Sequence, residues 1–305
     1  MPPFWISIAV LSLAQGALVS VPGALRAPGL ARLRARRWAV IPPLSVIGFV
    51  GIARAAESAS AQGLTYLALV CVPVLAALAL GWLGQGARPA GALLVIPLFA
   101  LAWADRGGLA GESAALVLSA LSCVALGVLL AAITPPRWLA AGIVAMAIAD
   151  SALVISDLLQ RPNNALNAAH PAAGLPRLQS AVWGSAVMGY GDLFIAGALG
   201  ALLATAAGRS PQLRAAALCA LLALCFDLLF FLVDELPATV PVAATLVVLT
   251  LARRRARRAK APSASAQEPT GPRPVLQPEP AVLPGGRPAT HLSDPARPEQ
   301  ARAAP

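Results

Sequence analysis

The sequence predicts an all-α fold, a polytopic transmembrane bundle of about nine helices. The chain of 305 residues is 58% hydrophobic and only 12% charged, whereas soluble domains are about 45–50% apolar and about 25% charged. Apolar runs of about 20 residues recur along the chain, and each could cross a hydrocarbon core of roughly 30 Å. Because that core holds no water to bond the backbone, each run is expected to be a helix.

The apolar runs predict the spans in chain order. We place them near residues 4–22, 38–55, 64–84, 90–106, 113–133, 138–159, 180–207, 213–233 and 236–252. The first run lacks positive charge before its apolar stretch and is followed by a basic cluster. We therefore interpret it as a retained span rather than a signal peptide.

The chain is expected to divide into three parts. Spans one to five occupy residues 1–135, and spans six to nine occupy residues 136–255. Residues 256–305 become rich in proline beyond the last span. Such a composition buries too little apolar surface to offset the entropy of ordering, so we expect a disordered cytoplasmic tail.

The basic residues predict the orientation in the membrane. Arginines cluster after the first span and after the last, and connections on that side hold fifteen Lys and Arg against four on the other. Positive charge marks the cytoplasmic side. We expect a plasma-membrane protein with its amino terminus outside and its carboxyl terminus in the cytoplasm. The net charge of +10 then reflects this topology, and no nucleic-acid partner is expected.

Four acids stand out well inside predicted spans, namely Asp150 and Asp157 in the sixth, Asp192 in the seventh and Asp227 in the eighth, whereas Asp105, Glu112, Asp234 and Glu235 lie near span ends, where water is available. A charge at such a position costs about 2.5–3.5 kcal/mol, which makes these acids functional candidates. At 1.5 Å per residue from the outer face, Asp150 and Asp192 lie roughly 15 and 18 Å deep, and Asp157 only about 4–5 Å. Neighbouring antiparallel helices could therefore set Asp150 beside Asp192.

Two carboxyl groups in contact cannot both ionise at low cost, so they share one proton. Aspartic proteases use this arrangement to activate water. It needs neither a nucleophilic side chain nor a metal, and the sequence indicates no cofactor.

The residues before Asp192 strengthen the prediction. Gly189 and Gly191 flank Tyr190 directly ahead of this acid. Glycine weakens a helix by about 1 kcal/mol relative to Ala, and it permits the close backbone approach that a peptide substrate would need. The alternative is helix packing through small residues, since further glycines follow in the same span.

A third motif, Pro237-Ala238-Thr239, opens the last predicted span. Proline removes a backbone donor and loosens the first turn of a helix. Carbonyl groups exposed there could pair with an extended substrate or hold the two acids in place. The alternative is an ordinary helix that starts at a proline.

Together the three features resemble the presenilin and signal peptide peptidase family of intramembrane aspartyl proteases. That family has nine spans, with one catalytic aspartate in a YD motif of span six, a second in a GxGD motif of span seven, and a PAL motif at the start of span nine. Gly189-Tyr190-Gly191-Asp192 matches GxGD fully. Ala149-Asp150 lacks the tyrosine, and Pro237-Ala238-Thr239 has Thr in place of Leu. The resemblance covers roughly residues 138–252.

The resemblance implies that Asp150 and Asp192 are catalytic. It also implies supporting or substrate-binding roles for two short segments, Gly189-Tyr190-Gly191 and Pro237-Ala238-Thr239. The implied partners are the lipid bilayer and transmembrane peptide substrates, including leftover signal peptides.

Other functions stay open at this point. A proton- or cation-coupled transporter could use Asp150, Asp192 and Asp227 as a relay, and an inactive homologue of the protease family would share its motifs. A prepilin peptidase ranks third, because that family typically has a lysine two residues after the GxGD aspartate, where this chain has Phe194. The only histidines, His170 and His291, lie outside the spans, which disfavours zinc and serine intramembrane proteases.

Overall fold

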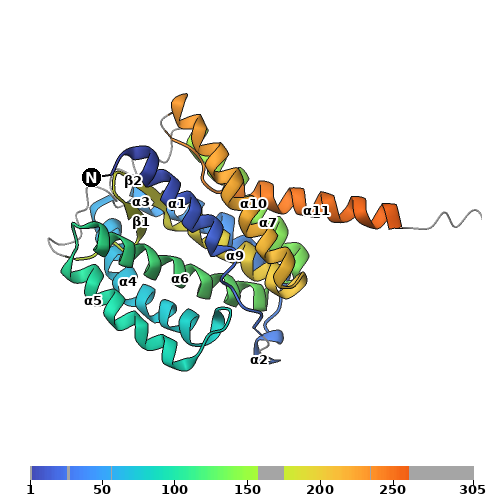
Figure 1. Ribbon diagram of the computed structural model, residues 1–305, viewed down its shortest axis with the longest axis horizontal. Coiled ribbons are helices and arrows are strands. Elements are labelled where there is room, and N and C mark those ends of the chain that lie inside the picture. The colour runs from blue at the N-terminus through green and yellow to red at the C-terminus, as the bar shows by residue number, and fades with distance from the viewer. Residues whose placement is uncertain (1, 26–27, 56, 157–174, 234, 261–305) are drawn as a thin grey trace, which may run out of the picture. The chain divides into compact units, whose positions relative to one another are not determined.

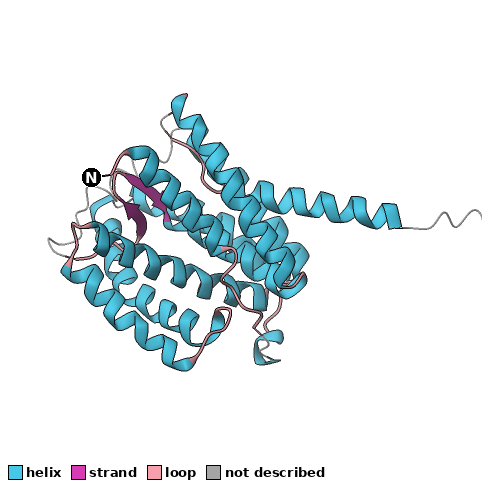
Figure 2. Ribbon diagram, in the orientation of Figure 1, coloured by secondary structure: helices cyan, strands magenta, loops and turns pink. Residues whose placement is uncertain are grey.

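The computed structural model describes residues 2–25, 28–55, 57–156, 175–233 and 235–260. The compact unit is Met1–Lys260, and it is mostly helical (Figures 1 and 2). The predictions for Asp157, both histidines and the tail beyond residue 260 lie outside the described residues.

The first half of the chain is entirely helical where the structure describes it. Its elements are α1 (Phe4–Leu18), α2 (Pro28–Ala31), the 3₁₀ helix η1 (Arg36–Val40), α3 (Ile41–Ala55), α4 (Glu57–Leu78), the π-helix η2 (Ala79–Leu83), the 3₁₀ helix η3 (Pro89–Leu94), α5 (Val95–Ala104) and α6 (Leu109–Ile133).

The second half contains helices and one pair of strands. Its elements are α7 (Pro136–Ile155), β1 (Ser180–Trp183), β2 (Ala186–Gly189), α9 (Tyr190–Ala206), α10 (Arg209–Asp227), the 3₁₀ helix η5 (Leu228–Phe231) and α11 (Val240–Lys260).

The centre of the unit is the contact between α6 and α9. A Cβ atom added to Gly127 would lie 2.5 Å from the backbone carbonyl carbon of Gly197, and one added to Gly197 would lie 2.6 Å from the carbonyl oxygen of Cys123. Small residues let two membrane helices approach this closely. Gly197 therefore serves helix packing, which was the alternative explanation for the glycines of this span.

In the part of the chain that the structure describes, four helices are long and apolar enough to cross a membrane. They cover Gly63–Leu83, Leu109–Ile133, Pro136–Ile155 and Arg209–Phe231. Three shorter apolar helices cover Phe4–Leu18, Pro89–Ala104 and Tyr190–Ala206. Large apolar side chains such as Val70, Leu93 and Ile96 are exposed on α4, η3 and α5, which suits contact with lipid rather than water. The fold is that of a helical membrane protein, and the count of nine spans stays a prediction.

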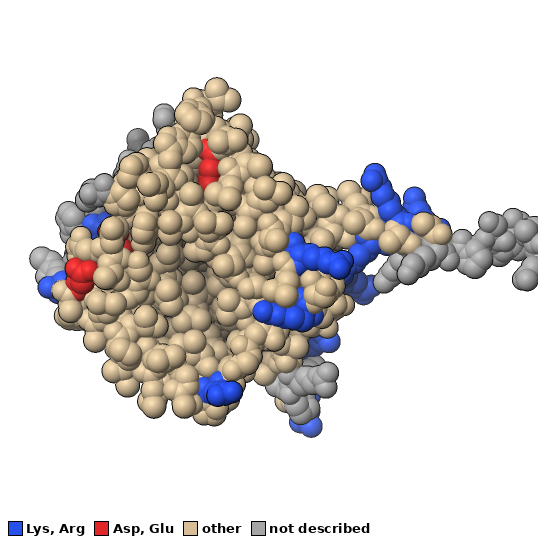
Figure 3. Space-filling model, viewed as in Figure 1, with Lys and Arg blue, Asp and Glu red and all other residues tan. Residues whose placement is uncertain are grey.

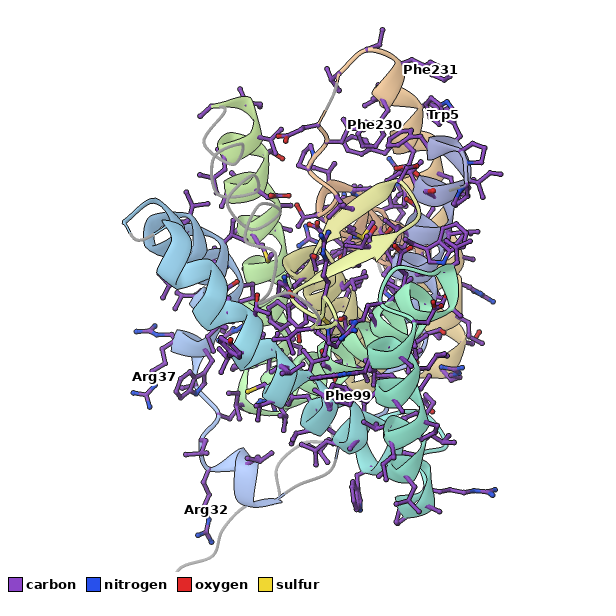
Figure 4. All side chains as sticks on the ribbon, turned by 90° about the vertical axis from the view of Figure 1, so that its left-hand side faces the viewer. Trp5, Arg32, Arg37, Phe99, Phe230 and Phe231 are labelled. Atoms are coloured by element: carbon purple, nitrogen blue, oxygen red, sulfur yellow. The ribbon has the colours of Figure 1, made fainter. Side chains whose placement is uncertain are left out.

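Aromatic side chains gather at one end of the unit, and tryptophans also stand beside arginines, where Arg37 lies over Trp38 and Arg137 over Trp138. Figure 4 shows Trp5, Phe230 and Phe231 at one end and Arg32 and Arg37 toward the other. The rings of Trp5 and Phe231 stack at a centroid distance of 4.4 Å. Figure 3 shows an uncharged central surface, with Lys and Arg gathered toward the far end of α11. Lys and Arg beside apolar helices are typical of the cytoplasmic side of a membrane protein, and tryptophans are typical of both boundaries.

The prediction of a seventh helical span from residue 180, within an all-α fold, is wrong at its start. Residues Ser180–Gly189 form an antiparallel hairpin, in which Val182 pairs with Val187, and the helix begins at Tyr190. Apolar composition does not separate a buried strand from a helix. The signals for the hairpin are the β-branched residues around the short turn and Gly184, whose positive φ of 61° favours glycine.

Polar side chains of α1 and α6 hold the turn of this hairpin. The N–H of Gly184 donates to Glu112 Oε2 at 2.7 Å, and Trp183 Nε1 donates to Ser113 Oγ at 3.0 Å. The N–H of Ser185 donates to Ser7 Oγ at 3.2 Å. Non-helical backbone is tolerated at membrane depth only where protein groups or water satisfy it, and these bonds provide that for the turn.

Candidate active site

Asp192 lies in the first turn of α9, directly after the hairpin. Gly189 ends β2 in an extended conformation, and its N–H donates to Asp192 Oδ2 at 3.0 Å. An acid in this position caps its own helix and benefits from the positive end of the helix dipole. The sequence predicted two glycines well inside a helical span; instead Gly189 belongs to a strand, and Asp192 stands at the junction of strand and helix.

Gly191 and Tyr190 fix the start of α9 against two other helices. A Cβ atom added to Gly191 would lie 3.1 Å from Met146 Cε on α7. Met146 precedes Asp150 by four residues, so both share one face of α7. The Tyr190 hydroxyl and Ser122 Oγ of α6 are 2.6 Å apart. Gly191 thus allows the close approach of α7, and Tyr190 anchors α9 to α6.

Asp150 faces the third motif and the second acid. Thr239 Oγ1 donates to Asp150 Oδ2 at 2.7 Å, and the backbone N–H of Thr239 is within reach of the same carboxyl group. Met146, one helical turn before Asp150, packs against Gly191, which directly precedes Asp192, so the two acids lie near each other where α7 meets α9. Both acids are partly buried rather than sealed. The structure therefore places two acids from separate helices near each other, and neither acid is fully buried.

Residues 237–239 run into α11 without being helical. The carbonyl oxygen of Pro237 accepts the N–H of Val240 at 3.1 Å, and that of Ala238 accepts Gln15 Nε2 at 2.8 Å. The Ala238 carbonyl is therefore occupied rather than open to a substrate. Thr239, which departs from the family pattern, supplies the hydroxyl that contacts Asp150. The segment holds the site in place.

The three motifs lie at similar distances along their helices from an arginine-bearing end. Asp150 follows Arg137 by 13 residues on α7, and Arg253 follows Val240 by 13 residues on α11. On α9, Ala206 follows Asp192 by 14 residues and ends the helix just before Arg209. At 1.5 Å per residue, each motif is about 20 Å from the arginine-bearing end of its helix. These distances are counted from the arginine-bearing ends, so the hairpin before α9 does not affect them.

Asp227 stands apart from the other two acids. Ser12 Oγ of α1 donates to Asp227 Oδ2 at 2.7 Å. Its partner is thus a hydroxyl group of the amino-terminal helix, whereas the acid near Asp192 is Asp150.

The contacts that α1 makes with the site were not expected from the sequence. Gln15 Nε2 donates to the backbone carbonyl of Asp192 at 3.2 Å as well as to that of Ala238. The candidates within the spans were acids and the residues of the two short motifs, and a single uncharged amide in the first span matched neither pattern. The available signal was the spacing of Ser12 and Gln15, three residues apart in an otherwise apolar helix.

The fold and the site together define a helical membrane protein with two neighbouring acids inside its helical bundle. Comparisons with protein-family models, with curated proteins and with solved structures found no match to this chain.

Proposed function

We propose that the chain is an intramembrane aspartyl protease in which Asp150 and Asp192 form the catalytic pair. The observation that carries the proposal is the convergence of three motifs from separate helices. Asp150 of α7 lies near Asp192 of α9, and Thr239, just before α11, is hydrogen-bonded to Asp150. Burying two acids side by side is unfavourable unless they share a proton, and a shared proton is what water activation by two carboxyl groups requires.

The reaction needs only water as co-reactant. One ionised carboxylate takes a proton from water while the water oxygen bonds to the carbonyl carbon of the substrate. The other carboxyl group gives its proton to the carbonyl oxygen, which yields a tetrahedral diol. The diol then collapses: one of its hydroxyl groups gives a proton to the ionised carboxylate, the C–N bond breaks, and the nitrogen takes the proton held by the other acid as the amine leaves. Both acids return to the state of one shared proton.

The proposed substrates are transmembrane peptides, including leftover signal peptides. In the proposed topology, the amino terminus is outside and the carboxyl terminus is in the cytoplasm of the cell. Among the described residues, β2 pairs only with β1, and it leads directly to Asp192. Its other edge could pair with an extended peptide through main-chain hydrogen bonds, which would lay the peptide beside the acids.

Cleavage of a synthetic apolar helix tests the proposal. The purified protein, in lipid vesicles prepared with ¹⁸O-labelled water, should cut the peptide into two products detected by mass spectrometry. One ¹⁸O atom should enter the new carboxyl group, because water attacks directly. An intact peptide after prolonged incubation with folded protein would remove the protease proposal.

Thr239→Val is expected to lower kcat by about 10- to 100-fold with the fold retained. The substitution keeps the side-chain size but removes the hydroxyl donor to Asp150, and a hydrogen bond to a charged group contributes about 1.5–3 kcal/mol. Thr239→Ser keeps the donor and should retain most of the activity.

The matched control is Thr245→Val. Thr245 is also buried, but its hydroxyl donates to the carbonyl oxygen of Pro241 within α11. Its loss should change thermal stability slightly and kcat little. Equal kcat values for Thr239→Val and the wild-type protein would show that this hydroxyl does not serve the reaction.

A further inference from the structure

The amino-terminal helix α1 carries a buried polar side in an otherwise apolar sequence. Ser7, Ser12 and Gln15 are all less than 3% exposed. Ser7 accepts a hydrogen bond from the hairpin turn, and Ser12 donates to Asp227. Buried polar groups in a membrane helix are unfavourable unless they are bonded, so each member of this set marks a point where α1 is attached to another element.

Gln15 has the contacts closest to the acids. Its side-chain nitrogen donates to the carbonyl of Ala238 at 2.8 Å and to that of Asp192 at 3.2 Å. An amide nitrogen has two N–H groups, one for each carbonyl. A single side chain thereby joins the start of α9 to the segment before α11.

This junction completes a continuous set of contacts between the two acids. Asp150 is bonded to Thr239, Thr239 follows Ala238 in the chain, and Gln15 joins Ala238 to the backbone of Asp192. The relative placement of the two carboxyl groups therefore depends on a residue from the opposite end of the sequence.

We propose that Gln15 is a positioning residue of the active site, which sets Asp192 relative to Asp150 by fixing α9 to residues 237–239. The inference rests on the proposed protease function. Gln15 touches no reacting atom. Without its amide, the two segments are free to separate, and a misplacement of about 1 Å is enough to lower a rate by about 100-fold.

Gln212 provides a matched comparison within the same chain. It is also fully buried, and its Nε2 donates to the carbonyls of Val19, Pro22 and Gly200 at 2.9–3.2 Å. It joins α10 to the end of α1 and to α9 through the same chemistry, but it contacts none of the three motifs. A purely structural effect of losing a buried amide should appear equally in both variants.

The experiment compares Gln15→Met, Gln15→Asn and Gln212→Met in the full chain reconstituted in lipid vesicles. Cleavage of the synthetic helix gives kcat and KM. Titration with a peptide whose scissile bond is replaced by a hydroxyethylene group, which mimics the diol, gives the number of intact sites and their affinity. Loss of folding lowers the number of sites, whereas misplacement of the acids lowers the affinity of each site.

Gln15→Met is expected to lower kcat per intact site by about 10- to 100-fold and to weaken binding of the diol mimic by a similar factor, with KM changed less than about twofold. Gln15→Asn keeps a buried amide that is one methylene too short to reach both carbonyls, so it should fold and show an intermediate loss. Gln212→Met should keep the wild-type kcat per intact site.

Two results would overturn the inference and are distinguishable. Wild-type kcat and affinity per site in both Gln15 variants, while the wild-type protein cleaves the peptide, would remove the role of Gln15 alone. A wild-type protein that neither cleaves the peptide nor binds the diol mimic would remove the proposed function and this role with it.

Discussion

Asp192→Asn is expected to reduce peptide cleavage by about 100- to 10,000-fold, the range that proton transfer by a positioned side chain contributes. The amide has the size of the carboxyl group but can neither take a proton from water nor give one to a carbonyl. It can still accept the N–H of Gly189 through its oxygen, so the helix start should remain capped. Asp150→Asn should have an effect of similar size.

The double variant gives a sharper result than either substitution alone. Because the two acids act as a unit, the variant with both replaced should be no slower than each single variant. Product formation followed by mass spectrometry measures all three. Activity of Asp192→Asn near that of the wild-type protein would contradict the catalytic pair.

Asp227→Asn is the control for these variants. Asp227 is bonded to Ser12, so its replacement should leave kcat nearly unchanged. Proton or cation flux across the vesicle membrane that needs all three acids would instead favour the transporter. A chain that binds the diol mimic but never cleaves a peptide would be an inactive relative of the proteases.

Gly197→Val is expected to destabilise the protein by about 3 kcal/mol, at the upper end of the usual penalty for overpacking a core. Its first added carbon would lie 2.6 Å from the carbonyl oxygen of Cys123. Because that neighbour is backbone, it cannot move aside unless α6 and α9 separate. Separation of these helices would also strain the contact between Tyr190 and Ser122, so activity should fall with stability.

Thermal unfolding in detergent, followed by intrinsic tryptophan fluorescence, measures the loss. The matched control is Gly48→Val on α3, where an added Cβ would meet no atom within 4 Å. A substitution at such a position should change stability by no more than about 0.5 kcal/mol. Equal melting temperatures for the two variants would contradict the proposed packing of α6 on α9.

Asp150 and Thr239, which are hydrogen-bonded in the structure, were each singled out by local signals in the sequence, whereas the pairing of Asp150 with Asp192 stays a prediction. Acids are rare within apolar runs, and prolines at a helix start are visible without any partner. The predicted depth of Asp192 assumed a helix from residue 180, which was wrong because residues 180–189 form a hairpin. Asp150 and Asp192 nevertheless lie at similar distances from the arginine-bearing ends of their helices, where α7, α9 and α11 are regular.

Neither the hairpin nor the contacts of Gln15 were predicted from the sequence, and the reasons differ. Residues 180–189 are mostly apolar, and because Val187 is apolar although exposed, no alternation of polar and apolar residues marks the strand. The partners of Gln15 lie 177 and 223 residues away in the chain. Periodicity within α1 shows that Gln15 faces the same way as Ser12, but it carries no information about which distant carbonyl groups lie opposite.

The similar distances of the three motifs from the arginines link the rate of the proposed reaction to the thickness of the bilayer. With about 20 Å between the acids and the arginines, and a hydrocarbon layer of roughly 30 Å, the acids lie about 10 Å from the opposite boundary. The helices have fixed lengths, whereas the layer thickens with every carbon added to the acyl chains. Longer acyl chains would bury the acids farther from the aqueous phase opposite the arginines and slow the proposed hydrolysis, and shorter chains would accelerate it.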